Sequence, residues 1–177
     1  MSDPEMILMC EQNIRGGVSF VNECHVNLSH YDGEDEEKVQ DHLLYMDANN
    51  LYSVAQADLV PVGNYSWLSE EELDGMEEEG EILSISATGP TGYILEVDLE
   101  YPQSLHAAHA SMPLAPEKKE ITYTDLSPYA QESLVHLRGE NRAETYSAQK
   151  LCSTLKDKKC YVVHYRNLQT YLTLGLI

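Results

Sequence analysis

The sequence contains few of the features that would place a protein in a membrane or a secretory compartment. None of its apolar stretches approaches the roughly 18 residues that a membrane-spanning helix needs. Its N-terminal residues lack the charged, apolar and small-residue regions of a secretory signal peptide. We therefore expect an intracellular protein that makes no contact with a membrane.

Cysteine is also scarce, and its spacing excludes the usual cysteine-based sites. The four cysteines are Cys10, Cys24, Cys152 and Cys160, and no two of them form a CxxC pair. Neither a zinc knuckle nor a disulfide framework is indicated by this spacing. Free structural thiols are the expected outcome.

Basic residues are few and unevenly placed. The chain has 11 lysines and arginines against 30 acids, a formal net charge of −19. Residues 1–117 carry 24 acids and two basic residues, whereas residues 118–177 carry six acids and nine basic residues. The acids cluster at 33–41 and 69–81, in runs that are typical of solvated surface or loop. Taken alone, this balance argues against an autonomous nucleic-acid binder, which needs a basic face.

The pattern of apolar residues predicts a mixture of helices and strands, an α/β pattern, in a chain of 177 residues that fits one domain or part of a larger one. Residues 43–47 read as a buried strand that ends at Asp47, and 18–21 as a short strand. Residues 93–101 alternate between apolar and polar types, which predicts a half-buried strand. The apolar stretch at 1–13 is compatible with either a strand or a short helix.

Several helix boundaries are marked by capping residues. A helix begins within 50–57, and Ser69 with Glu72 forms the capping box of another. Ser127 followed by a proline predicts a helix that ends at Gly139. A final helix is predicted from a stripe of apolar residues, followed by a glycine. These residues are Tyr161, Tyr165, Leu168, Leu172 and Gly175.

Asp47 is the first candidate functional residue, because a carboxylate at the end of a buried strand is costly unless a charge or hydrogen bond meets it. Two interpretations are open. Asp47 could bind a metal ion or a charged ligand, or it could be a buried cap of the following helix, with Tyr52 as an ordinary core residue. The residues alone favour the second interpretation.

A resemblance favours the first interpretation. DANNLY at 47–52 resembles the first polymerase motif of family B DNA polymerases, Asp-x-x-Ser/Asn-Leu-Tyr-Pro. Further stretches are similar, in the same order, to segments of the protein-primed polymerases of Polinton (Maverick) transposons. They are IRGGVSFV at 14–21, VPVGNYSWLSEEEL at 60–73, GYILEVDLEYPQSLH at 92–106, MPLAPEK at 112–118 and LKDKKCYVVHYRNLQTYLTLGL at 155–176.

The resemblance implies an α+β fold, a partial polymerase palm made of an antiparallel sheet with helices. It also implies a site for template-directed nucleotidyl transfer. It assigns Asp47 as a ligand of Mg²⁺, of which the complete enzyme holds two ions. The backbone of the next four residues would contact metal or triphosphate, and the ring of Tyr52 would exclude a 2′-hydroxyl. These four are Ala48, Asn49, Asn50 and Leu51. The implied partners are a DNA primer–template, deoxynucleoside triphosphates and a terminal protein primer, and the implied location is the nucleus.

Two further groups are assigned to DNA. The resemblance implies that Arg15, Gly16 and Gly17 contact the template strand, with an ordinary glycine turn and a surface arginine as the open alternative. A basic group near the end of the sequence is a candidate for DNA phosphates; it consists of Lys156, Lys158, Lys159 and Arg166. The chain departs from the family at Ile14, where Tyr is usual, and at Ser53, where many members have Pro.

The resemblance divides the chain into four segments. Residues 1–42 form a lead-in, and 43–68 hold the first palm strand and the motif. Residues 69–150 are an inserted acidic segment that includes a strand at 92–101. Residues 151–177 form a palm helix region, and its end resembles a chain cut before its next strand.

The sequence lacks the family's second motif, Lys-x-x-x-Asn-Ser-x-Tyr-Gly, and its third, Asp-Thr-Asp. One carboxylate cannot hold two metal ions in catalytic geometry. We therefore expect a DNA polymerase fragment that is inactive alone. The rival hypothesis is a polymerase remnant that acts as an acidic interaction protein or has no function.

Two apparent motifs are not interpreted as sites. Asp98-Leu99-Glu100 matches the Asp-x-Glu of proofreading exonucleases, but it lies after the polymerase motif instead of before it. We interpret it as a solvated acidic face. His106 and His109 lack an evident third metal ligand, so we expect two partly exposed histidines near a loop.

Overall fold

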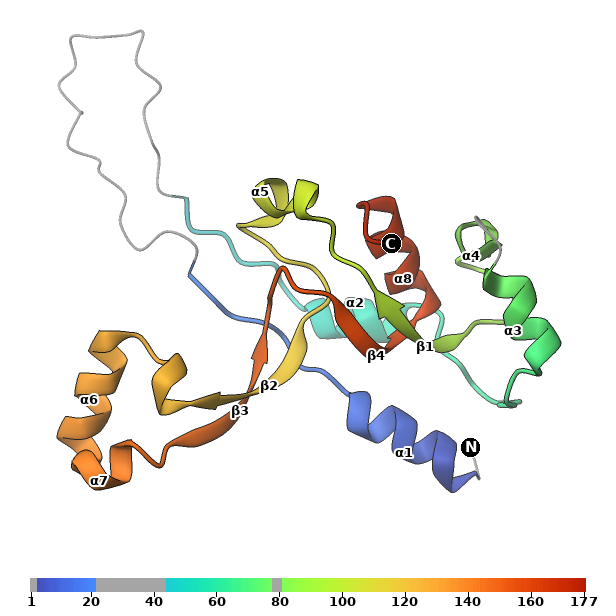
Figure 1. Ribbon diagram of the computed structural model, residues 1–177. Coiled ribbons are helices and arrows are strands. Elements are labelled where there is room, and N and C mark those ends of the chain that lie inside the picture. The colour runs from blue at the N-terminus through green and yellow to red at the C-terminus, as the bar shows by residue number, and fades with distance from the viewer. Residues whose placement is uncertain (1–2, 22–43, 78–80) are drawn as a thin grey trace, which may run out of the picture. The chain divides into compact units, whose positions relative to one another are not determined.

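The computed structural model describes residues 3–21, 44–77 and 81–177 (Figure 1). The chain divides into two compact units: residues 1–18 together with 64–177, and residues 19–63. Helices and two small antiparallel sheets make up the fold, in agreement with the predicted α+β class. Cys24, Leu43 and the acidic run at 33–41 lie outside the described residues.

The larger unit is built around the antiparallel pair of β1 (Ile94–Leu99) and β4 (Lys158–His164). The predicted alternation in β1 is confirmed, because Leu95 and Leu99 are buried while Glu96 between them is exposed. One extra residue in β4 forms a bulge opposite the end of β1. Cys160 in this bulge has a φ of 49°.

Helix α8 (Tyr165–Thr173) follows β4 directly (Figure 1). Its buried residues are Tyr165 and Leu168. The prediction of a final helix is therefore correct for Tyr165, Leu168 and Leu172 and wrong for Tyr161, which lies in β4. The three successive buried residues 161–163 pair with β1, which is the pattern of a strand covered on both faces. Gly175, with a φ of 99°, follows the helix end as expected.

The second sheet is the antiparallel pair of β2 (Glu117–Thr122) and β3 (Ser147–Cys152). At one end of this ribbon lie η2 (Tyr123–Asp125), α6 (Pro128–Arg138) and α7 (Glu140–Ala143) (Figure 1). The boundaries of α6 agree with its capping signals: Ser127 accepts a bond from the Ala130 amide, and Gly139 ends the helix.

Shorter helices complete the larger unit. The open choice at 1–13 is settled as a helix, α1 (Pro4–Asn13), with Asp3 at its N-cap. The capping box of α3 (Glu70–Glu77) is confirmed, because Ser69 and Glu72 bond to each other's amides. The remaining elements are α4 (Glu81–Ser84), η1 (Gln103–Leu105) and α5 (His106–His109).

Lys158 joins the two sheets and is 2% exposed. Its ammonium group lies 3.1 Å from the Glu117 carboxylate on β2, and it donates to the Thr154 hydroxyl and to the Lys156 carbonyl at 2.7 and 2.6 Å. A buried charge that is fully bonded in this way avoids most of the cost of desolvation. The boundary expected between residues 150 and 151 falls inside β3. Strands β1 and β4, which come from its two sides, pair in one sheet.

The smaller unit contains α2 (Leu51–Ala57), which confirms the helix expected within 50–57. The strand expected at 43–47 is not found: residues 44–48 have no strand pairing and are exposed. Residues 18–21 are not a strand either. A strand is stable only beside a partner, and neither segment has a ladder partner among the described residues.

Candidate functional site

The candidate site is the junction between an extended segment and α2. Asp47 is exposed and is followed by a turn at Asn49 and Asn50. Asn50 is the N-cap of α2 and adopts the left-handed conformation, with φ 60° and ψ 41°. Asparagine tolerates this conformation better than most residues do. The turn lets the chain pass within three residues from the Asp47 carboxylate into the first turn of a helix.

The residues assigned to the site from the sequence lie together on this junction. Ala48, Asn49 and Asn50 form the connection, and Leu51 begins α2. All of them are exposed, and Tyr52 in the first turn of the helix is 87% exposed. The carboxylate, the phenol ring and the intervening backbone are therefore accessible from solvent.

The alternative interpretation of these residues is wrong. A buried helix-capping Asp47 with Tyr52 as core would require both residues to be covered. Asp47 is exposed, the N-cap is Asn50, and that asparagine makes no side-chain capping bond. The segment before Asp47 is not buried either. Its residues Leu44, Tyr45 and Met46 are 75%, 92% and 79% exposed.

Arg15 lies in the larger unit, and its guanidinium is engaged with β4. It donates a 2.7 Å hydrogen bond to the Val162 carbonyl, and its carbon lies 3.9 Å from the centre of the Tyr161 ring. This engagement does not fit a plain surface arginine, and contact of Arg15 with a template strand stays a prediction. Gly16 and Gly17 have open space where a Cβ would be, so packing does not require glycine at either position.

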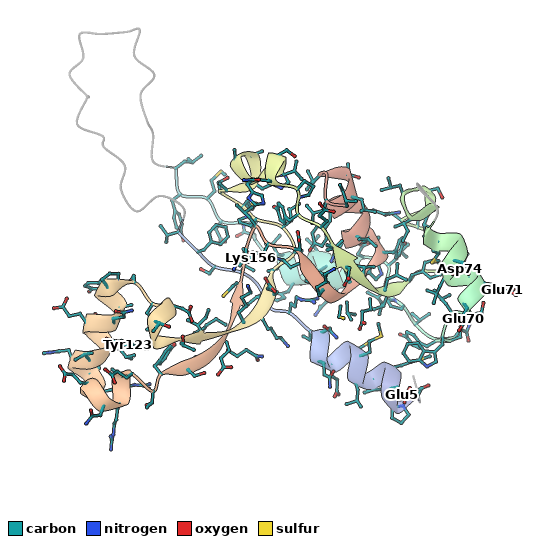
Figure 2. All side chains as sticks on the ribbon, in the orientation of Figure 1. Glu5, Glu70, Glu71, Asp74, Tyr123 and Lys156 are labelled. Carbon is teal, nitrogen blue, oxygen red and sulfur yellow. The ribbon has the colours of Figure 1, made fainter. Side chains whose placement is uncertain are left out.

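The basic group expected to contact DNA phosphates is not one exposed cluster. The expectation that Lys158 contacts a DNA phosphate is wrong, because its ammonium group is buried beside Glu117. Burial lowers the pKa of Lys158, and the nearby Glu117 carboxylate partly offsets this shift by raising the pKa. Lys159 is paired with Asp98 at 2.8 Å, which raises its pKa. Lys156 is exposed on the loop between β3 and β4 (Figure 2).

Arg166, the fourth member of the basic group, lies at the start of α8 beside His164. The His164 ring accepts a hydrogen bond from the Arg166 amide and is the N-cap of the helix. Burial lowers the pKa of His164, and the Arg166 charge lowers it further. Burial also raises the pKa of the neighbouring Tyr161 phenol above its usual range.

The residues of the two apparent motifs that we did not interpret as sites make contacts within the fold. Asp98 is on the exposed face of β1, where it accepts bonds from Lys159 and from the Cys160 amide. Both histidines are half-buried and pack edge-on against Tyr101. The Tyr101 hydroxyl lies 2.8 Å from His109 Nδ1 and accepts from the Leu114 amide.

The residues present do not fit a complete two-metal centre. Within residues 3–21, 44–77 and 81–177, no three His, Cys, Asp or Glu side chains are close enough to hold a metal ion. Asp47 supplies one carboxylate, with the Ala48 carbonyl next to it in the chain. Magnesium bound by two-metal enzymes needs further carboxylates. Asp47 and the Ala48 carbonyl would supply only part of such a centre.

The sequence did not predict two long-range contacts that organise the larger unit. The pair of Lys158 and Glu117 joins residues 41 apart, and Arg15 reaches Val162 across 147 residues. A lysine within a charged run such as LKDKK carries no sequence signal that distinguishes the buried residue from its neighbours.

None of the helices in the described part of the chain has the length and apolarity to cross a bilayer. Comparisons of the chain with protein-family models, with characterised proteins and with solved structures find no match.

Proposed function

We propose that this chain is part of a DNA-directed DNA polymerase of the protein-primed family B type, in which Asp47 supplies one of the metal-binding carboxylates. The observation that carries the proposal is the placement of DANNLY on an exposed junction between an extended segment and a helix. A ligand of a metal–triphosphate complex has to be accessible, and both Asp47 and the backbone after it meet that requirement.

Two-metal nucleotidyl transfer requires carboxylates that bridge the metal ions to the attacking hydroxyl and the triphosphate. Asp47 would provide one such ligand, and the backbone of Ala48 to Leu51 would lie beside the phosphates. Tyr52 would stand beneath the sugar and exclude a 2′-hydroxyl. The second and third polymerase motifs are not in the sequence, so the proposed activity belongs to a polypeptide or complex that supplies them.

The proposal is tested first at the level of the gene. The reading frame after the codon for Ile177 is sequenced, and the longer product is expressed if that frame encodes the two missing motifs. We expect the longer product to extend a primer with Mg²⁺ and deoxynucleotides, whereas the 177-residue chain does not. A downstream sequence without the motifs, or a longer product that cannot extend a primer, would overturn the proposal.

Matched variants of the longer product then test the site itself. Asp47→Asn removes a metal ligand and should lower kcat by about 10²-fold or more. Asp58→Asn is the control, because Asp58 is an acid at the other end of the same helix. Tyr52→Val should increase incorporation of ribonucleotides relative to deoxynucleotides. Equal activity of Asp47→Asn and Asp58→Asn would exclude Asp47 as a metal ligand.

A further inference from the structure

Strand β1 pairs with β4 along one edge, and its other edge is open. In an antiparallel pair, the backbone groups of successive residues point alternately to the two sides of the strand. The Tyr165 amide donates to the Tyr93 carbonyl at 3.0 Å, so odd-numbered residues of this segment face β4. Ile94, Glu96 and Asp98 therefore direct their backbone N–H and C=O groups away from β4.

A hydrogen-bond pair at the end of β1 supports this assignment independently. The Glu100 amide donates to the Ile177 carbonyl at 2.6 Å, and the Ile177 amide donates to the Glu100 carbonyl at 3.2 Å. A reciprocal pair of this kind is the repeating unit of an antiparallel ladder. Glu100 is even-numbered, so Ile177 lies on the edge opposite β4 and marks the position, direction and register of a third strand.

Along the rest of this edge the backbone groups have no partner. In the part of the chain that the structure describes, the outward backbone groups of Ile94, Glu96 and Asp98 make no hydrogen bond. The outer edge of β4 differs, because the Arg15 guanidinium binds the Val162 carbonyl there. The Val162 carbonyl is thereby occupied, and an added strand could bond to it only by displacing Arg15. Of the two outer edges of this sheet, the edge of β1 is the one available.

The side chains along β1 indicate which strand would fit. Residues opposite each other in an antiparallel pair lie on the same face of the sheet. Glu96, Asp98 and Glu100 are exposed on one face, whereas Leu95 and Leu99 are buried on the other. Asp98 is already paired with Lys159 at 2.8 Å, so a basic residue opposite it would share that carboxylate. An added strand would thus place every second residue beside the acids and the intervening residues beside the apolar face.

We propose that the open edge of β1 binds an extended segment of a partner polypeptide, antiparallel to β1, in which basic residues alternate with apolar ones. Backbone hydrogen bonds to residues 94, 96 and 98 would provide the ladder, and the acidic row would select the basic residues. A second copy of β1 fits poorly, because like charges opposite each other are destabilising. The proposal and the polymerase assignment make different demands on this edge, because a longer polymerase chain that continued past Ile177 as the next strand would occupy it.

The test uses the full 177-residue chain and a fluorescently labelled peptide of alternating valine and lysine, acetylated and amidated at its ends. Binding is measured by fluorescence anisotropy at low salt. In the proposed register the lysines lie opposite Glu96 and Asp98, so the lysine amides point toward β1 and the valine amides point away. Methylation of the lysine amides should reduce affinity at least about tenfold, whereas methylation of the valine amides should change it little.

Charge selection is tested on the chain. Glu96→Lys replaces attraction by repulsion and should weaken binding of the lysine peptide by about tenfold, since each cross-strand charge pair contributes roughly two- to fivefold. The same variant should bind a valine–glutamate peptide better than the parent chain does. Glu71→Lys, on the exposed side of α3 (Figure 2), makes the same charge change away from β1 and should have a much smaller effect.

Hydrogen exchange identifies the edge directly. The peptide should slow exchange at the Glu96 and Asp98 amides, while the Leu95 and Val97 amides, which face β4, should change little. Equal binding of the two methylated peptides would mean charge attraction alone and would overturn the proposal. Protection of the Glu96 amide without peptide, in a dimer or in a longer product that continues past Ile177, would also overturn it, because the edge would then belong to this protein itself.

Discussion

Two runs of three apolar residues, each containing one tyrosine, differ completely in burial. Tyr161, Val162 and Val163 lie in β4 and are each at most 5% exposed. Leu44, Tyr45 and Met46 precede Asp47 and are each at least 75% exposed. Hydrophobicity alone therefore does not distinguish a strand from an unpaired segment.

The difference between the two runs is the presence of partners. The run in β4 pairs with β1 through a continuous register and is covered by α8 and by the Arg15 side chain. The run before Asp47 has no ladder partner among the described residues. Burial of apolar area stabilises a segment only when another surface covers it, so the run before Asp47 gains none of the stabilisation that the run in β4 does.

The largest effect on the free energy of unfolding is expected when the same substitution is made in the two regions. Leu99→Ala removes a side chain that is 2% exposed in the core and should lower the free energy of unfolding by about 2–5 kcal/mol. Leu44→Ala, at a site that is 75% exposed, should change it by less than about 0.5 kcal/mol. Urea denaturation of both variants measures the difference. A similar loss in both would show that Leu44 is buried in solution.

A second comparison concerns two lysines that are two residues apart. Lys158→Met leaves Glu117 and Thr154 without their ammonium partner and should cost about 1–3 kcal/mol of unfolding free energy. Lys156→Met, on the exposed loop, should have little effect on stability. Thermal unfolding of the two variants tests this order. If Lys156→Met is the more destabilising variant, the buried position of Lys158 is wrong.

A third, smaller effect is expected at the capping box. Ser69→Ala removes the hydroxyl that accepts from the Glu72 amide and should destabilise α3 by about 1 kcal/mol. Ser66→Ala, in the exposed segment before the helix, serves as the control. Hydrogen exchange of the amides in α3 should quicken in the first variant and stay unchanged in the second. Unchanged exchange in Ser69→Ala would mean that the box does not hold this helix.

The smallest expected effect is a pH dependence at His164. Burial holds the pKa of His164 below its usual value of about 6.5. The unfolded chain therefore binds the proton more readily, so stability falls as pH falls through the window between the unfolded pKa and the lower folded pKa. Protonation also removes the ring nitrogen that accepts from the Arg166 amide.

His164→Asn keeps a capping acceptor that does not titrate, so this variant should lose less thermal stability between pH 7 and pH 5 than the parent chain does. His136→Asn, at an exposed position of α6, should keep the parent's pH dependence. Scanning calorimetry across this pH range compares the three proteins. If the parent and His164→Asn lose the same thermal stability between pH 7 and pH 5, His164 does not contribute to the acid sensitivity.

Local signals predicted the elements whose boundaries depend on neighbouring residues. The caps at Ser69, Ser127 and Gly139 act within a few residues of chain, and each of them is found where it was expected. The alternation of β1 was also readable, because one face of that strand is buried and the other is solvated. The prediction for Tyr161 failed because its helical spacing from Tyr165 competes with pairing to β1, 64 residues away.

For the candidate site, the sequence identified the motif at 47–52 but not its setting. It predicted a buried strand before Asp47, whereas the structure has an exposed segment, a left-handed turn at Asn50 and then a helix. The basic group was misread in the same way, because Lys158 turns into the protein and Lys156 does not. Charge and motif order can be read from a chain, but the direction of a side chain depends on what packs beside it.

The sequence by itself determined the mixture of helices and strands, the helix caps, the alternating strand and the separation of acidic from basic segments, because each depends on nearby residues or on composition. Only the tertiary structure decided which apolar run is buried, which lysine is paired and which edge of the sheet stays open. These outcomes depend on contacts such as Arg15 with Val162 and Lys158 with Glu117, between residues far apart in the chain. Such contacts form because burial and hydrogen bonding together outweigh the entropy of ordering the chain.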